Sequence, residues 1–389
     1  MAIPNLMRFA AFSIIGTATL MPLLVLPAMI GVLVDNAGMS EQWAGWSASA
    51  NFLASAIVGM LIALRVHHLN LRELSIWALS IAIVADLASG LTAGSTMIFF
   101  AARIVAGVML GAAYVAVVSS FARYDGFERG FGLYVTLQFT VSGLGLYVVP
   151  VYADQMGAMG LFGGFAVLDL LALGFARFLP SAKADDKVHD KAGHDGKAES
   201  PNELKILLGL SAIMAILGFA AFEAANNAQF TYIERFGVFL GVSDQRIGFS
   251  LLIASLIGIP GAFSIVVIGQ RLGTLGPLVF GITIAMLGVA TLLFANSYVA
   301  YFIGSCCMGF SWAFCLPFIQ SFLATIDRKG SAIAAGTSLS TLGSAIGPGL
   351  AAVVVADSAY GNVFMLSIGL FVVTLLLFIV AAKSKRKIV

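Results

Sequence analysis

The sequence predicts an all-α membrane protein, and three observations support this fold class: its composition, its long apolar runs and its charged central segment. Hydrophobic residues make up 60% of the 389 residues and charged residues only 10%, and the mean hydropathy is +1.00. A soluble domain carries about 25% charged residues. The chain therefore has too little polar surface to cover itself in water. This excludes an ordinary cytosolic enzyme, a nucleic-acid binder and a disordered scaffold, and it predicts the lipid bilayer as the surrounding partner.

Twelve apolar runs are long enough to cross the bilayer as helices. Crossing about 30 Å of hydrocarbon takes about 20 residues per helix, and twelve such helices fit within 389 residues. The runs are continuous rather than alternating, which argues against a membrane β-barrel. Pro22 and Pro27 in the first run and Pro260 in the eighth could interrupt their helices. The expected spans are 9–34, 43–64, 74–94, 97–121, 131–152, 158–179, 206–230, 246–268, 275–295, 298–324, 332–355 and 361–382.

The basic residues predict the orientation of these spans, because Lys and Arg accumulate in cytoplasmic loops. If both termini are cytoplasmic, eighteen of the 21 Lys and Arg residues lie on that side, only Arg235 and Arg246 lie outside, and Arg103 lies within a span. We therefore expect a multi-pass protein of a bacterial-type inner membrane or plasma membrane with both termini in the cytoplasm.

The central segment divides the chain into two halves of six spans each. Residues 181–204 hold four lysines and six carboxylates with almost no apolar bulk, which is typical of a flexible linker. The expected domains are thus an N-terminal half at 1–180, a cytoplasmic linker at 181–204 and a C-terminal half at 205–389. The halves also repeat each other: SEQWAGWS at 40–47 returns as SDQRIGFS at 243–250, an offset of 203 residues. Transporters built from six-helix halves place the substrate site between them.

Several motifs resemble those of the major facilitator superfamily, and the resemblance covers essentially the whole chain. Arg103, Gly107 and Gly111 match the family pattern R-x-x-x-G-x-x-x-G, which is associated with proton-coupled carriers. Gly343, Gly347 and Pro348 match its G-x-x-x-G-P pattern. In drug antiporters of the family that signature lies in the fifth span, where this sequence lacks the Gly-Pro pair. The resemblance implies twelve helices in two pseudo-symmetric halves and a functional monomer.

The family also carries a gating loop between spans two and three, with a counterpart in the second half. In the family its acidic residue caps a neighbouring helix and its arginine pairs with a carboxylate. Here His67 and Gln270 stand in the acidic positions, 203 residues apart, and His68 directly follows His67. The basic residues are Arg72 and Arg271. The resemblance thus implies either a weakened latch or, through His67, a pH-sensitive contact.

Ionisable residues inside a bilayer are expensive, so each needs a partner or a function. Asp86 and Arg103 lie at matching depths in the third and fourth spans, which predicts an ion pair. The pair could be structural, or it could act as a proton-coupling switch or an anion-binding arginine. Asp169 is expected to be an internal hydrogen-bonded acid of the sixth span, and a transport role remains open.

Glu223 is the strongest functional candidate. Asn226 and Asn227 follow it by three and four residues, so the three polar side chains share one helical face. This face could bind solute or exchange a proton; the alternative is a helix-end role near the outer gate. Tyr232, Glu234 and Arg235 are expected to be anchors at the membrane–water interface. Other polar candidates on presumed cavity helices are Asn51, Tyr114, Gln138, Trp312 and Gln320.

These features favour a secondary transporter that moves a small organic solute by alternating access and is driven by a proton gradient. The missing Gly-Pro pair favours symport, with uptake of an organic or aromatic acid, over the alternative of proton-antiport efflux of amphiphilic compounds. A non-transporting membrane sensor has less support. No nucleotide-binding loop is present, and no enzyme activity, metal or cofactor is expected.

Overall fold

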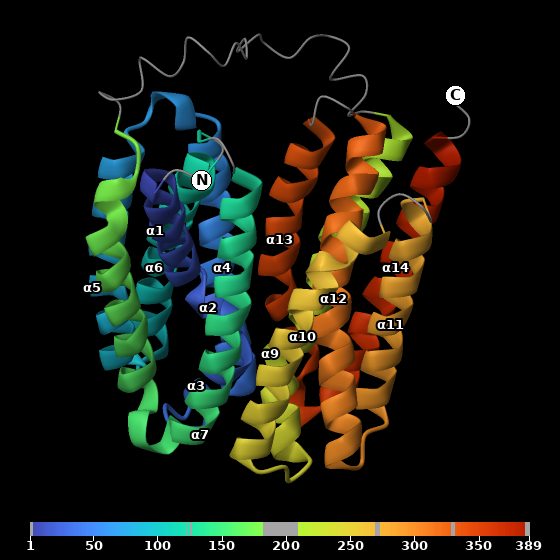
Figure 1. Ribbon diagram of the computed structural model, residues 1–389. Helices are drawn as coiled ribbons and strands as arrows, with labels where there is room; N and C mark the ends of the chain where they lie inside the picture. The colour runs from blue at the N-terminus through green and yellow to red at the C-terminus, as the bar shows by residue number, and fades with distance from the viewer. Residues whose placement is uncertain are drawn as a thin grey trace. The chain divides into compact units, whose positions relative to one another are not determined.

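All regular structure in the computed structural model is helical, as the sequence predicts (Figure 1). The residues described are 3–121, 123–124, 127–181, 209–268, 273–327 and 331–385. Ten helices in this part of the chain are long and apolar enough to cross a membrane. The chain divides into two compact units, Met1–Gly196 and Lys197–Val389. The predicted linker, apart from residue 181, lies outside the described residues.

The first unit is built from helices that follow one another with short connections. They are α1 (Ile3–Thr19), α2 (Met21–Leu24), α3 (Leu26–Asp35), α4 (Glu41–Ala63), the short 3₁₀ helix η1 (Val66–His68), α5 (Leu71–Thr92), α6 (Thr96–Phe121), α7 (Phe127–Phe175) and the 3₁₀ helix η2 (Ala176–Phe178).

The second unit has six long helices. They are α9 (Leu210–Phe239), α10 (Asp244–Ile268), α11 (Leu275–Leu293), α12 (Tyr298–Ile326), α13 (Ser331–Val354) and α14 (Tyr360–Lys385), with the 3₁₀ helix η3 (Ala356–Ser358) before the last.

Backbone interruptions occur in the first predicted span, as expected from its prolines, and also in α7. The first predicted span is divided into α1, α2 and α3, with Pro22 and Pro27 each in the first turn of the next helix, where a missing N–H does no harm. In α7, Gly157 has non-helical angles (φ 54°, ψ −169°) between the fifth and sixth predicted spans. Pro260, in contrast, lies inside the uninterrupted α10.

Helix α9 corrects one prediction. It runs to Phe239, well beyond the expected end at residue 230. Tyr232, Glu234 and Arg235 therefore lie within the helix, and their exposed fractions are 0%, 5% and 8% rather than those of side chains at a surface. The apolar count ended the span too early because the helix continues through polar residues that other side chains cover.

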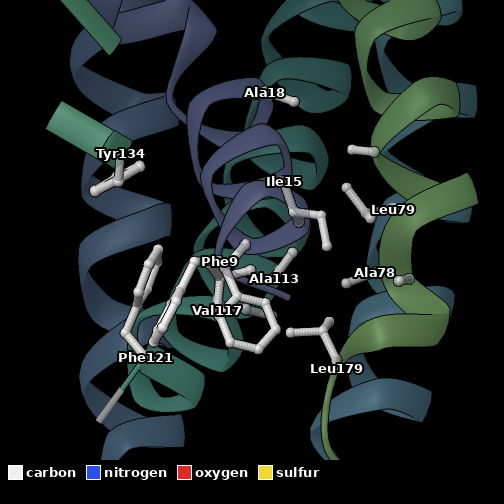
Figure 2. Close-up of a cluster of buried hydrophobic side chains, with 14 residues drawn as sticks. Phe9, Ile15, Ala18, Ala78, Leu79, Ala113, Val117, Phe121, Tyr134 and Leu179 are labelled. Carbon is white, nitrogen blue, oxygen red and sulfur yellow. The ribbon is translucent and has the colours of Figure 1, made fainter. Parts of the chain in front are cut away.

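A cluster of buried aromatic and aliphatic side chains holds the first unit together (Figure 2). Phe9 of α1 stacks on Phe121 of α6 with ring centroids 5.8 Å apart, and Tyr134 of α7 packs on the same ring at 5.6 Å. Ala78 and Leu79 bring α5 into the cluster. The packing fixes the position of Tyr134, whose hydroxyl takes part in a polar cluster described below.

The sequence repeat is also a structural repeat. Gly38 and Gly241 are 203 residues apart, and both have left-handed φ angles, 67° and 70°, which glycine adopts without strain. Within the first unit, Gly107 of α6 lies against the backbone carbonyl of Asn51 of α4. Within the second unit, Gly309 of α12 lies in the same way against Ala254 of α10. Each unit therefore brings one equivalent helix pair together through a glycine.

The packing predicts that Gly309→Ala is destabilising, because the added methyl group would overlap the carbonyl oxygen of Ala254. We expect a loss of about 1–3 kcal/mol, measured as a lower temperature of unfolding in detergent. The matched control is Gly174→Ala in α7, where a Cβ meets no atom within 4 Å. Alanine should be neutral or slightly stabilising there. Equal shifts for the two variants would contradict the close approach.

Candidate functional site

Glu223 is the centre of a hydrogen-bonded cluster contributed by three helices of the second unit. Its carboxylate accepts from Trp312 Nε1 of α12 at 3.2 Å and from Ser344 Oγ of α13 at 3.0 Å. Asn227 Nδ2, one turn along α9, donates to the same carboxylate at 3.3 Å. Only 6% of Glu223 is exposed. The three donors are neutral, and the structure pairs Glu223 with no cationic side chain among the described residues.

Glycines of α13 place Ser344 within reach of Glu223. A Cβ at Gly343 would overlap the carbonyl oxygen of Ala220, and one at Gly347 would lie 2.7 Å from the carbonyl oxygen of Ala224. These two glycines, one turn apart, let α13 lie directly on the backbone of α9. The predicted G-x-x-x-G-P motif, with Pro348 inside α13, thus acts as a helix-packing surface next to the carboxyl.

Ser344 has a second acceptor, which bears on proton binding. Its hydroxyl is 3.2 Å from the carbonyl oxygen of Ser340 as well as 3.0 Å from Glu223. When Glu223 is ionised, the hydroxyl can donate to it. When Glu223 is protonated, the hydroxyl can turn to the Ser340 carbonyl and accept from the carboxyl. The cluster can therefore satisfy both protonation states without moving a helix.

Two predicted site residues do not join this cluster. Asn226 donates back to the Phe222 carbonyl of its own helix at 2.8 Å, and its Oδ1 has no partner among the described residues. Gln320 is exposed, and the described part of the chain gives it no hydrogen bond. Ser344 is the member that we did not predict from the sequence, since a serine in a span is usually a packing residue.

Tyr114 and Gln138 meet in a separate polar cluster of the first unit, through Tyr134. Gln138 Nε2 donates to the Tyr134 hydroxyl at 2.9 Å, and the Tyr114 and Tyr134 hydroxyls are hydrogen-bonded to each other. The cluster connects α6 to α7 at the aromatic core, to which Tyr134 belongs and against which Tyr114 packs. Tyr134 is a member that we did not predict from the sequence, although it lies one helical turn before Gln138.

Arg103 and Asp86 form the ion pair predicted from their depths, between α6 and α5. Arg103 Nε also donates to Ser89 Oγ at 3.0 Å, and the guanidinium lies 4.7 Å from the centre of the Phe162 ring. Asp169 of α7 also contacts Asp86. Asn51 donates to the backbone carbonyl of Arg103 at 2.7 Å, so it connects α4 to α6. All five polar residues are at least 97% buried.

The predicted gating residues are only partly described. Arg72 donates through Nε to the Leu179 carbonyl at 3.0 Å, which joins the start of α5 to the chain after η2. His68 is exposed in η1, and His67 lies in η1 with a side chain outside the described part. Gln270 and Arg271 also lie outside the described residues. No group of three His, Cys, Asp or Glu in the described chain could hold a metal ion.

Comparison with known proteins identifies a matching sequence family and solved structures with a similar fold. The sequence profile of the Major Facilitator Superfamily matches residues 8–348. No curated protein sequence matches the chain significantly. A crystal structure of the nucleoside transporter NupG has a TM-score of 0.73 at 12% identity and covers 97% of this chain and 99% of its own; a mutant of NupG gives 0.76 at 11%, covering 96% and 99%.

A second kind of transporter has the same fold. A crystal structure of a D-xylose-proton symporter has a TM-score of 0.73 at 14% identity and covers 96% of this chain and 97% of its own. At these identities the likeness establishes the fold alone.

Proposed function

This chain belongs to the Major Facilitator Superfamily, and from that premise we propose that it is a secondary transporter that takes up a small polar organic solute together with a proton. It is an integral multi-pass membrane protein with many apolar helices. We propose twelve spans, with α1–α3 as the first and the two parts of α7 as the fifth and sixth. Both termini and the linker at 181–204 are then cytoplasmic, and the protein works as a monomer.

The observation that carries the proton-coupling proposal is the Glu223 cluster. An ionised carboxyl in the membrane interior is costly unless its charge is balanced. Glu223 has three neutral donors and no cationic partner among the described residues. Ser344 can serve the carboxyl both with and without its proton, and this suits a group that changes protonation state in each transport cycle.

Two solute classes are compatible with this site. The sequence-based expectation of an organic acid depends on Arg103 as the anion-binding group, but Arg103 is occupied by Asp86 and Ser89. The Glu223 cluster has no cationic side chain among the described residues, which favours a neutral solute with hydroxyl groups over an anion. The similar folds of transporters for nucleosides and D-xylose support including both in a panel. Proton-antiport efflux has less support, because the fifth span lacks the Gly-Pro pair.

Counterflow in proteoliposomes tests the proposal. Vesicles containing the purified protein are loaded with an unlabelled aromatic carboxylate, nucleoside or pentose, and entry of the labelled compound is followed without a pH gradient. We expect saturable counterflow for a neutral hydroxylated compound. Counterflow for the carboxylate alone would favour the organic acid and require Arg103 to be released. Solute-independent conductance would contradict a carrier.

A further inference from the structure

The Asp86–Arg103–Asp169 cluster of the first unit has an unusual balance of donors and acceptors. Arg103 binds Asp86 and Ser89 and stacks on Phe162. The exposed fractions of Asp86, Arg103 and Asp169 are 0%, 1% and 1%, so water does not reach these groups in this structure. Asp86 Oδ2 and Asp169 Oδ2 both lack a donor among the described residues. Two buried acceptors and one buried donor, Arg103 Nη1, thus remain without a partner within one cluster.

The contact between the two carboxyl groups bears on both unsatisfied acceptors. Asp86 and Asp169 are within hydrogen-bonding distance of each other. An ionised carboxylate has only acceptor atoms, so two ionised groups would repel each other at this contact. One proton between them turns the contact into a hydrogen bond, as in other carboxyl pairs that share a site.

The charge balance leads to the same conclusion. Helices α6 and α7 pack on α5, and the charged groups that face Asp86 from them are Arg103 and Asp169. One arginine and two ionised aspartates would leave a net charge of −1 in the membrane interior. One bound proton makes the cluster neutral, and neutrality is strongly favoured there.

We propose that Asp86 and Asp169 share one proton beside Arg103, forming a proton-binding site in the first unit that is separate from Glu223. This proton-binding site is additional to the proposed transport function, and the contacts and charges that support the site do not depend on that function. Either aspartate can be replaced by asparagine with the cluster still neutral, because one carboxylate remains for Arg103. The asparagine amide then donates the hydrogen bond that the shared proton made.

Infrared spectroscopy of the protein in lipid tests the proposal. The spectra of Glu223→Gln are compared with those of Glu223→Gln/Asp169→Asn and Glu223→Gln/Asp86→Asn, so that Glu223 does not contribute to the carboxyl region. We expect Glu223→Gln, which keeps both aspartates, to show the C=O stretch of a protonated carboxyl, shifted in D₂O, and both variants that also carry Asn to lose it. The exposed Asp154 provides the control: Asp154→Asn should leave the band unchanged.

Folding provides the second readout. Asp86→Asn and Asp169→Asn should each unfold within a few degrees of the wild type, whereas Asp86→Asn/Asp169→Asn should lose the folded protein because Arg103 has no counter-charge. If folded Asn variants keep the band, the shared proton is excluded. If both single variants fail to fold, the cluster needs both negative charges, and the proposal is equally overturned. Neither result depends on transport, so the proposed function stands or falls separately.

Discussion

Glu223→Gln is expected to abolish proton-driven accumulation of solute while leaving counterflow intact. Glutamine keeps the size of the side chain and can still hydrogen-bond Trp312 and Ser344, but it cannot gain or lose a proton. With one proton per solute, an inward gradient of one pH unit supports about tenfold accumulation, since each factor of ten corresponds to about 1.4 kcal/mol. The variant should equilibrate the solute without concentrating it.

The control for this experiment is Glu73→Gln, in which an exposed carboxyl near the start of α5 is changed in the same way. It should accumulate solute as the wild type does. If Glu223→Gln still accumulates solute, the coupling proton binds elsewhere. Loss of counterflow as well would assign Glu223 to solute binding or to folding, and the unfolding temperature would distinguish these two.

Arg103→Gln is expected to have the largest effect on stability. The substitution removes the only cation that contacts Asp86 among the described residues and leaves buried acids without a counter-charge. Removal of one partner from a buried ion pair costs about 3–5 kcal/mol, and the contact with Phe162 is lost as well. We expect little folded protein after extraction in detergent.

The comparison variant is Arg65→Gln, since Arg65 is exposed between α4 and η1. It should behave as the wild type in size-exclusion chromatography and thermal unfolding. A well-folded Arg103→Gln protein with the wild-type unfolding temperature would show that the ion pair contributes little to the fold. Arg103→Lys tests the geometry, because lysine keeps the charge but cannot reach Asp86 and Ser89 with one planar group.

The sequence alone predicts the membrane class, the helical fold and the interruption of the first helix, because apolar run length and proline are local signals. It also predicts the Asp86–Arg103 pair, since a short turn fixes the relative depth of two adjacent spans. Contacts between distant helices are harder to predict. Asn226 and Asn227 both satisfy the spacing from Glu223, yet only Asn227 reaches the carboxylate.

Two contacts that the sequence does not predict show why contacts between distant helices are difficult to predict. Ser344 binds Glu223 because Gly343 brings α13 onto α9, and no local pattern in either helix reveals which faces meet. The contact of Asp169 with Asp86 is equally hidden from the sequence, because it joins two helices, α7 and α5, that are far apart in the chain. The end of α9 was also misplaced, because burial of Glu234 and Arg235 depends on tertiary packing that hydropathy does not record.

Accumulation by the wild-type protein tests the central claim of proton-coupled uptake most directly. Proteoliposomes are given the solute identified by counterflow, first with equal pH on both sides and then with an acidic exterior. The proposed symport predicts that the internal concentration only equals the external one at equal pH and rises above it with the inward proton gradient. Unchanged accumulation would contradict proton coupling, and solute expulsion under that gradient would show antiport instead.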